Sequence, residues 1–561
     1  MTYFDCYPTT SVSARNIEFL EKRLNPVKHG IRSNCFEGTR KDILRKIYAW
    51  AKDSSKQNIL WLSGSPGAGK SAIATTAVSY LLKKQPTVTF YFERGHAALG
   101  DPAALWYNIA FGLACHDPAL QNDIVQVLKD PQVDVDYNIR DHFKHLIEGP
   151  LLKNHKIVSA KHPLVIVVDA LDECNSSDST SAPRDILLQT VRRWSQLPKQ
   201  FKLIVTSRPE SDIVSCLEGV SQHIVLQTGD QVTSQTSQDI QHFFKHHFSI
   251  IAKPYHPKLS AWPKAEIIDQ LTKQAAGLFI WAETVIRFMK QGVPTEQLSL
   301  ILDGKLGMGD IDSLYLTILR NSFNTSTLES FNVVAGSIVL ARLPLTCNDL
   351  EKLLHGVETD ISIAFVLDRL KSVISIDHEN GIQIMHQTFA DFLKDVKRSG
   401  EAFAIDQPKQ SKTLALGCLR VMNGQEGLRF NICNLETSHV FNNQMVDLTA
   451  LIKTAIPSHL SYACCFWAQH LQDIPKQNSD SILPESVDKF AHTHLLHWLE
   501  VLSLMDKVSV ASKALDAAGQ WFQVGNKHKL MEPELESLIQ FLLSDFPCGP
   551  FSISGRFQEI C

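Results

Sequence analysis

The sequence predicts an α/β domain with a parallel sheet, followed by a largely helical region. A glycine-rich loop lies between an apolar run at 59–62 and a helical segment at 71–84. Two further apolar runs, at 164–168 and 201–206, are typical of strands buried on both faces of a sheet. Beyond residue 237, apolar residues recur mostly with helical spacing. A chain of 561 residues is too long for one core, so we expect roughly three to four domains.

Composition narrows the class of protein. With 44% hydrophobic and 20% charged residues, the chain has the composition of a folded globular protein. Its net charge of −4 offers no basic surface for nucleic acid. We see no signal peptide and no apolar run long enough for a membrane span. The 12 cysteines show no metal-ligand spacing, so we expect reduced thiols and a cytoplasmic location.

The glycine-rich loop fits the pattern G-x-x-x-x-G-K-[ST] in the strand–helix context that a phosphate-binding loop requires. Glycines let backbone N–H groups point inward, and the helix N-terminus adds a positive dipole end. The lysine is expected at the β- and γ-phosphates and the serine hydroxyl on Mg²⁺. A glycine-rich turn opening an ordinary helix is the alternative. The predicted nucleotide-binding residues are Gly64, Ser65, Pro66, Gly67, Ala68, Gly69, Lys70 and Ser71.

Acidic residues follow the apolar run at 164–168. Carboxyl ends of parallel strands meet at one edge of the sheet, so these residues are expected beside the phosphate loop. Asp169 is predicted to hold Mg²⁺ together with Ser71, and Asp172 and Glu173 to orient or activate the attacking water. The alternative is an acidic surface turn, which the upstream phosphate loop makes less attractive.

Arg208 follows the strand predicted at 201–206. An arginine at the tip of a strand beside the acidic one can contact a γ-phosphate and report its presence. A surface arginine before a proline is the competing interpretation. Strands are also predicted at 87–92 and 223–226.

The chain divides by pattern into five parts. We predict a short extension at 1–33, an α/β NTPase domain at 34–227, a helical domain at 228–328, a winged helix at 329–400 and an all-helical region at 401–561. Residues 13–24 form an amphipathic helix that either docks on a partner or merely extends the chain. Two patterns predict the winged helix. They are a capping box at Thr346–Asp349 and a hairpin with strands at 373–377 and 382–385.

Five segments together resemble the fungal NACHT-type NTPases of the STAND class, whose NTPase domain is also called nephrocystin-like. They are SGSPGAGKSAIATT, VIVVDALDEC, LIVTSRPE, AAGLFIWAET and IMHQTFADFL. The resemblance runs from about Asn34 to Trp521. It implies a RecA/AAA-like parallel sheet and a slow NTPase that acts as a switch, closed with ADP and oligomeric with ATP.

By position, the resemblance makes Arg208 the sensor arginine and His386 the histidine that contacts the β-phosphate in the closed state. A structural histidine is the alternative for His386. Phe279 stands where related NTPases carry a proline close to the base of the bound nucleotide. The family also implies unknown effector and trigger proteins, and domains at both ends that this sequence does not show.

Three functions remain open at this point. The first is the nucleotide-dependent signalling switch, with ATP/ADP and Mg²⁺ as cofactors. GTP stays open, although no NKxD guanine motif follows the phosphate loop. The second is a conventional P-loop ATPase or kinase, for which no lid arginines or acceptor pocket are visible. The third is a scaffold with structural nucleotide, which has no need of Asp169, Asp172 and Glu173.

Overall fold

The computed structural model describes most of the chain between residues 13 and 525. The described residues are 13–27, 32–94, 96, 98–130, 138–155, 163–174, 182–255, 259, 262–304, 306–356, 362–377, 379–436, 442, 447–475 and 482–525. They fall into two compact units. The first comprises Met1–Ile318 with His386–Thr388, and the second Leu319–Met385 with Phe389–Cys561. The finer five-part division stays a prediction.

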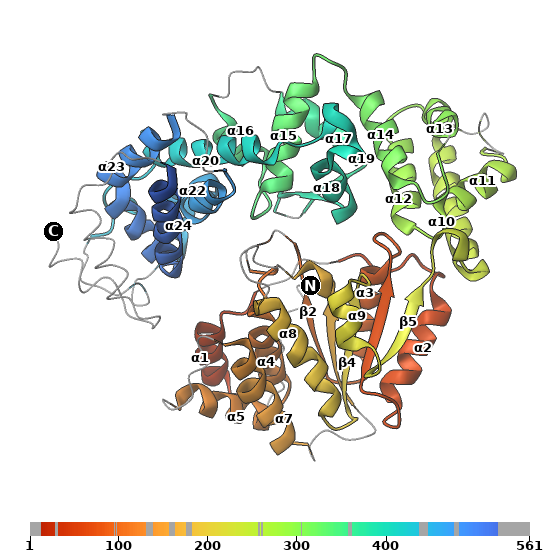
Figure 1. The fold of residues 1–561 in the computed structure, drawn as a ribbon, viewed down its shortest axis with the longest axis horizontal. Coiled ribbons are helices and arrows are strands. Elements are labelled where there is room, and N and C mark those ends of the chain that lie inside the picture. Colours follow the sequence, from red (N-terminus) through yellow and green to blue (C-terminus); the bar gives the residue numbers. More distant parts are fainter. Residues whose placement is uncertain are drawn as a thin grey trace. The chain divides into compact units, whose positions relative to one another are not determined.

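A five-stranded parallel sheet forms the centre of the first unit (Figure 1). The strands follow the order β2-β3-β4-β1-β5, so the phosphate-loop strand β1 lies between β4 and β5. The predicted parallel α/β class is therefore confirmed. The strand bounds are β1 (Ile59–Gly64), β2 (Thr87–Tyr91), β3 (Leu164–Asp169), β4 (Phe201–Ser207) and β5 (Ser221–Leu226).

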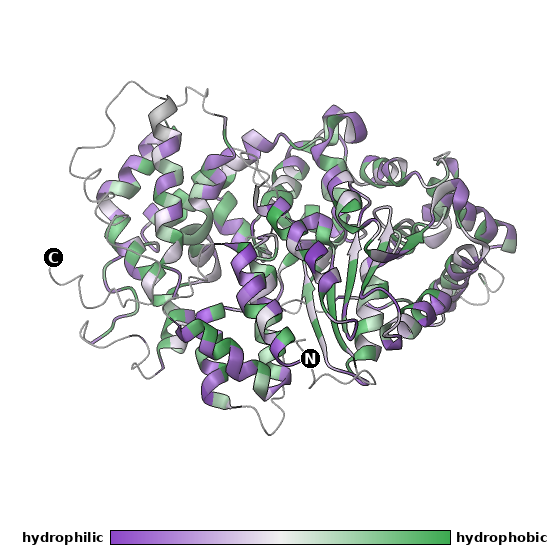
Figure 2. Ribbon diagram, turned by 60° about the horizontal axis from the view of Figure 1, so that its bottom comes forward, coloured by the Kyte–Doolittle hydropathy of each residue, from purple (hydrophilic) through white to green (hydrophobic). Residues whose placement is uncertain are grey.

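Helices cover both faces of this sheet because successive strand side chains point to opposite sides. Trp61 and Ile166 pack into the core of one face, whereas Leu60 and Val165 pack into the core of the other. Figure 2 shows these strands as a hydrophobic interior surrounded by helices of mixed hydropathy. The first face is covered by α1 (Ala14–Leu24), α4 (Ala104–His116), α5 (Pro118–Lys129), α7 (Gly149–Lys153), α8 (Ala182–Arg193) and α9 (Ser211–Leu217), and the second by α2 (Lys41–Lys52) and α3 (Lys70–Leu81).

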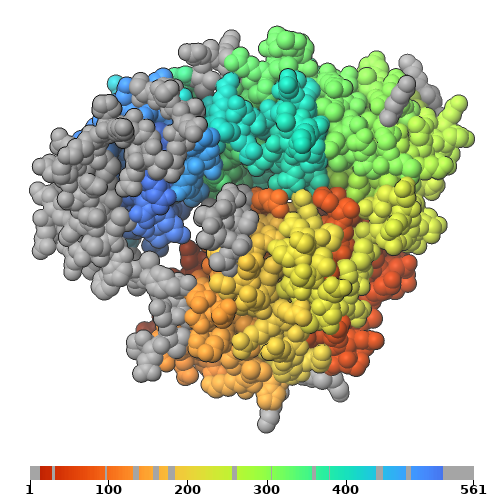
Figure 3. Space-filling model, in the orientation of Figure 1, coloured from red at the N-terminus to blue at the C-terminus, as the bar shows by residue number. Residues whose placement is uncertain are grey.

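The amphipathic helix α1 is built into this unit. Leu20 and Leu24 are buried in the core formed with α4 and α5. After the helix, the backbone N–H of Val27 donates to Oδ1 of Asn108 at 2.8 Å. The sequence left open whether this segment docks elsewhere, and the structure packs it against the sheet's helical layer. In Figure 3 the orange-to-yellow residues of α4 to α9 form a continuous surface.

The first unit continues with helices after β5. The sequence did not predict α13 or α5, although each begins at a recognisable signal: Pro294 is the first residue of α13, and Asp117 caps α5 just before Pro118. The helices after β5 are α10 (Ser234–Ala252), α11 (Ala265–Ala275), α12 (Phe279–Met289), α13 (Pro294–Asp303) and α14 (Ile311–Ser322).

The second unit opens with helices and a hairpin, as the sequence predicted. The capping box is present, with Thr346 and Asp349 each accepting from the other's backbone N–H. Strands β6 (Ile374–Ile376) and β7 (Ile382–Ile384) pair antiparallel; His378 of the predicted turn lies outside the described residues. The helices are α15 (Leu328–Leu340), α16 (Cys347–Leu354), α17 (Ile363–Leu370), α18 (Gln387–Lys394) and α19 (Val396–Phe403).

A helical region ends the described chain. Trp467 of α22 and Trp498 of α23 are buried and form part of its core. The predicted all-helical region runs to residue 561, and its residues 526–561 lie outside the described residues. Within them, no helix is both long and apolar enough to cross a bilayer. The helices are α20 (Gln407–Asn423), α21 (Leu448–Ala455), α22 (Ser458–Gln472), α23 (Ile482–Leu504) and α24 (Ser509–Gly525).

Candidate functional site

The predicted phosphate loop connects β1 to α3. Gly67 and Gly69 have φ angles of +80° and +92°, a left-handed conformation that glycine adopts without steric cost. Gly69 caps α3, whose first residue is Lys70 and second is Ser71. The first-turn N–H groups of α3 have no partner within the helix and can bind an anion. The strand–loop–helix context expected from the sequence is therefore present.

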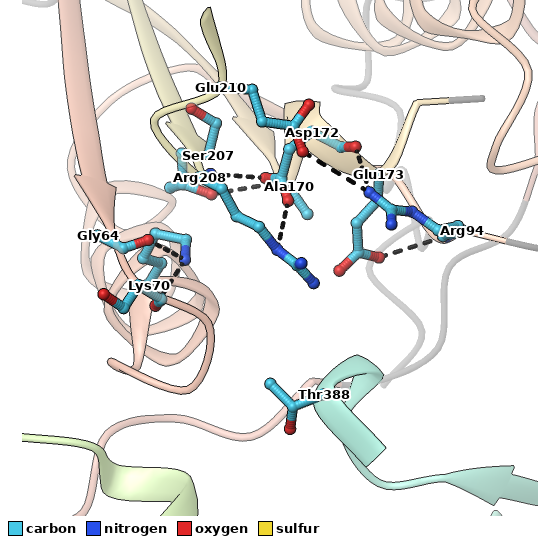
Figure 4. A network of polar contacts seen from close by, with 12 residues as sticks. Gly64, Lys70, Arg94, Ala170, Asp172, Glu173, Ser207, Arg208, Glu210 and Thr388 are labelled. Atoms are coloured by element: carbon cyan, nitrogen blue, oxygen red, sulfur yellow. Dashed lines mark hydrogen bonds and ion pairs between the residues drawn. The ribbon is translucent and has the colours of Figure 1, made fainter. Parts of the chain in front are cut away.

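The side chain of Lys70 turns back onto the loop. Its Nζ donates to the carbonyl oxygens of Gly64 at 2.8 Å and Ser65 at 3.1 Å, as Figure 4 shows for Gly64. Burial lowers the pKa of Lys70, while the nearby Asp172 raises it. The ammonium thus lies within the curve of the loop, on the same side as the carboxylates that follow β3.

The start of α12 packs directly on the loop. The backbone N–H of Ile280 donates to the carbonyl of Gly67 at 3.2 Å. A Cβ built on Gly67 would lie 2.0 Å from Cγ2 of Ile280, so only glycine fits there. No local pattern indicates this contact, because Ile280 lies in a different element far along the chain.

Arg40, at the start of α2, ties the loop to two other helices. Its Nη2 donates to the carbonyl of Ala68 at 2.6 Å, and its Nη1 donates to Oγ1 of Thr236 at 3.0 Å. Its backbone N–H donates to Asp239 at 2.9 Å. Its guanidinium lies 4.8 Å from the ring centre of Phe279, the residue that replaces the family's proline. Arg40 was not among the residues predicted for the site.

Asp169, the predicted Mg²⁺ ligand, is the last residue of β3 and is fully buried. Its Oδ1 accepts a hydrogen bond from Oγ1 of Thr206 at 2.5 Å. Its Oδ2 accepts one from Nη1 of Arg32 at 2.7 Å. The register between β3 and β4 brings Thr206 to this place, and the segment after α1 brings Arg32. Neither partner was predicted from the sequence.

Asp172 and Arg208 form an ion pair at the ends of β3 and β4. The backbone N–H of Arg208 donates to Oδ1 of Asp172 at 2.9 Å, and Nε of Arg208 lies 3.0 Å from Oδ2 (Figure 4). The sequence assigned Asp172 to the attacking water. In the structure its two carboxylate oxygens contact Arg208, and its role toward the attacking water stays a prediction.

Glu173 lies next to this pair and is only partly exposed. Its Oε2 accepts from the backbone N–H of Arg94 at 3.3 Å. Burial raises the pKa of Glu173 from 4.5 to about 7, against the opposing attraction of Arg32 and with a contribution from Asp172. A carboxyl group that titrates near neutrality is suited to act as a general base. Of the two predicted hydrolytic acids, Glu173 has the surroundings that this role requires.

A second arginine fixes the turn that carries these acids. Nη1 of Arg184 donates to the carbonyl of Cys174 at 2.9 Å. Its Nη2 and Nε bind Glu210 and Asp212 at 2.6 and 2.8 Å. The turn after β3 is thus tied to the segment that follows Arg208. These three charged residues were not predicted from the sequence.

His386 belongs to the short segment that groups with the first unit. Its Nδ1 accepts the backbone N–H of Thr388 at 3.1 Å, which leaves the ring proton of a neutral histidine on Nε2. Oγ1 of Thr388 in turn lies 2.8 Å from the hydroxyl of Tyr315. Cε1 of His386 lies 4.0 Å from a Cβ built on Gly67. The predicted phosphate-contacting histidine is therefore found at the phosphate loop; its role stays a prediction.

The described residues contain no cluster of three or more histidine, cysteine, aspartate or glutamate side chains suited to a metal. Mg²⁺ commonly binds through one or two protein ligands and completes its shell with phosphate oxygens and water. Ser71 and Asp169 supply oxygen donors of that kind. The described cysteines are all free thiols, in line with the expectation from the sequence.

The phosphate loop, the carboxylates at and after β3 and the arginine after β4 together form the arrangement that the sequence predicted for a P-loop NTPase. Residues 38–208 match the family described as nephrocystin 3, N-terminal. The vegetative incompatibility protein HET-E-1 of Podospora anserina is 24% identical over 509 residues, covering 84% of this chain. These two matches support the resemblance to fungal NACHT-type proteins that the sequence showed.

The chain spans 36% of the length of HET-E-1. Among solved structures, a STAND protein with a tetratricopeptide repeat sensor from Pyrococcus horikoshii is 12% identical, with a TM-score of 0.37 over 92% of this chain and 74% of that one. The Walker-type ATPase PABY2304 of Pyrococcus abyssi is 13% identical, with a TM-score of 0.31 over 64% of this chain and 98% of its own.

Proposed function

We propose that this protein is a nucleotide-dependent signalling switch that is closed with ADP, assembles into a homo-oligomer with ATP and hydrolyses ATP slowly. One observation carries the proposal. The phosphate loop, a carboxylate with a pKa of about 7 and an arginine held by a buried aspartate converge at the carboxyl ends of β1, β3 and β4. That combination suits binding of a nucleoside triphosphate and a response to its third phosphate.

The residues fit a nucleotide with Mg²⁺. Gly67 and Gly69 give the loop the left-handed conformation that turns N–H groups inward, and Lys70 adds a positive charge to it. Ser71 and Asp169 offer the hard oxygen donors that Mg²⁺ prefers. When bound, Mg²⁺ neutralises charge that develops on the phosphate oxygens. We assign phosphate binding to Gly64–Ser71 and the metal to Ser71 and Asp169.

Hydrolysis is assigned to Glu173, with Arg208 as the sensor. Glu173 takes a proton from water while it is ionised, which its pKa of about 7 permits at cytoplasmic pH. Asp172 holds Arg208 through two contacts, so the guanidinium is already oriented when a γ-phosphate arrives. His386 is assigned to the β-phosphate of the closed state, because it lies at Gly67 and its neutral ring carries the proton on Nε2.

The nucleotide purified with the protein is the first test. Mass spectrometry identifies it, and size-exclusion chromatography with light scattering gives the oligomeric state. We expect a monomer with stoichiometric ADP and an oligomer after exchange to ATP and Mg²⁺. The expected nucleotide is adenine-based; GTP or GDP would correct that assignment alone.

Lys70→Arg and Lys83→Arg form a matched pair for this test. Lys70 lies in the phosphate loop, whereas Lys83 is exposed beyond the end of α3. We expect Lys70→Arg to abolish nucleotide binding and Lys83→Arg to leave it unchanged. Tight binding by Lys70→Arg would contradict the assignment of this loop. An empty protein that turns over ATP rapidly without a partner would instead favour a conventional ATPase.

A further inference from the structure

Arg32 occupies the carboxylate to which the metal is assigned. Its Nη1 lies 2.7 Å from Oδ2 of Asp169, and its Nη2 donates to the carbonyl of Phe92 at 2.8 Å. Its Cζ lies 5.0 Å from the ring centre of Tyr91. The arginine is therefore held by a charge, a backbone carbonyl and an aromatic face. A planar guanidinium makes such a set of contacts, and a lysine cannot.

Arg32 and Mg²⁺ cannot share Asp169 without a large electrostatic cost. The carboxylate is fully buried, and its other oxygen already accepts the hydroxyl of Thr206. Two cations on one oxygen repel each other strongly where water is excluded. The buried aspartate nevertheless needs one cation, because an unpaired buried charge is strongly destabilising.

The segment that carries Arg32 is fastened on both sides. Before it, the N–H of Val27 is bound to Asn108 of α4. After it, the N–H of Cys35 donates to Oγ1 of Thr76 at 2.8 Å, and Thr76 belongs to the phosphate-loop helix α3. Arg32 therefore lies between a residue bound to α4 and a residue bound to α3.

We propose that Arg32 is the counter-ion of Asp169 in the metal-free protein and is displaced when Mg²⁺ binds with nucleotide, so that metal loading releases the segment after α1. This inference rests on the proposed nucleotide site and extends it. It makes the N-terminal segment a second element that responds to the nucleotide state, independent of the arginine sensor at the end of β4. The other possibility is a permanent structural counter-ion, which stays in place with Mg²⁺ bound.

The test measures the Mg²⁺ dependence of ADP binding, with a fluorescent N-methylanthraniloyl-ADP as the probe. We expect Arg32→Ala to lower the Mg²⁺ concentration at half effect about tenfold, within the 5–150-fold range of couplings between sites. Arg32→Lys keeps a charge without the fork and is expected to lie between. Arg45→Ala, on the exposed face of α2, is the matched control and is expected to match the wild type.

Hydrogen exchange of the wild type gives a readout that needs no variant to fold. We compare ADP with EDTA against ADP with Mg²⁺ and expect faster exchange in peptides covering 32–36 when Mg²⁺ is present. Unchanged exchange there, or an Arg32→Ala protein that needs more Mg²⁺ than the wild type, would overturn the displacement. If the wild type binds no ADP, the proposed function fails. Hydrogen exchange at 32–36 during titration with Mg²⁺ alone then shows whether Mg²⁺ displaces Arg32 from Asp169.

Discussion

Replacing Gly67 with alanine tests the packing of α12 on the phosphate loop. Two costs arise at this position. A left-handed φ costs an L-residue about 1–2 kcal/mol, partly offset by about 0.4–1 kcal/mol from a stiffer unfolded chain. The new Cβ would also lie 2.0 Å from Cγ2 of Ile280, and overpacking of this kind costs about 1–3 kcal/mol. We expect a loss of about 2–4 kcal/mol in total.

Gly219 provides the control for the backbone term. Its φ of +76° is similar, but a Cβ there meets nothing within 4 Å. Gly219→Ala is therefore expected to cost about 1 kcal/mol or less. The difference between the two substitutions isolates the overlap with Ile280.

Urea unfolding followed by tryptophan fluorescence and circular dichroism gives both free energies of unfolding. With a slope of about 3 kcal/mol per M, Gly67→Ala is expected to lower the midpoint by about 1 M. Ile280→Ala removes Cγ2, so in that background the cost of Gly67→Ala should fall towards that of Gly219→Ala. An unchanged cost in the double variant would refute the argument, because the overlap would then not be the cause.

Three further predictions concern Glu173, the hydroxyl bound to Asp169, and the contact of Arg40 with the phosphate loop. Because the folded-state pKa of Glu173 is raised to about 7 from 4.5, the folded protein favours the protonated carboxyl group and loses stability as the pH rises from about 4.5 to 7. Glu173→Gln should therefore raise the melting temperature at pH 8 and not at pH 4. ATP hydrolysis by the wild type should increase between pH 6 and 8, whereas that of the variant should stay low. Thr206→Val removes the hydroxyl that donates to Asp169 and accepts the N–H of Ala170, so the free energy of unfolding in urea should fall by about 2–4 kcal/mol. Thr206→Ser keeps the hydroxyl and should cost less. Equal losses in the two variants would contradict a role for the hydroxyl. Arg40→Lys keeps the charge but not the fork, so ADP affinity should fall several-fold, with the exposed Arg45→Lys unaffected.

Local patterns were enough to predict the main elements of the site. The phosphate loop is a contiguous segment whose conformation follows from its glycines, and β3 and β4 are apolar runs that only a sheet interior can bury. The order of these signals along the chain placed their carboxyl ends at one edge. For the same reason the capping box at Thr346 and the hairpin at 374–384 were predicted correctly.

The partners of the predicted residues could not be predicted in this way. Arg32 and Asp169 are 137 positions apart, and Arg40 and Thr236 are 196 apart. No local periodicity relates such residues, and an arginine in a short polar segment reads the same whether it faces solvent or a buried carboxylate. Only the packing of α1, α2 and α10 around the sheet brings them to the site.

The sequence by itself determined that this protein has a phosphate loop on a parallel sheet, with acids and an arginine on the neighbouring strands, because each of these features is encoded within a few consecutive residues. The tertiary structure decided the surroundings of each acid. Asp172 is bound to Arg208, Asp169 is shared between Thr206 and Arg32, and Glu173 is left with a pKa near neutrality. The physical reason is that burial and neighbouring charge set the behaviour of a carboxylate, and both arise only when distant segments pack together.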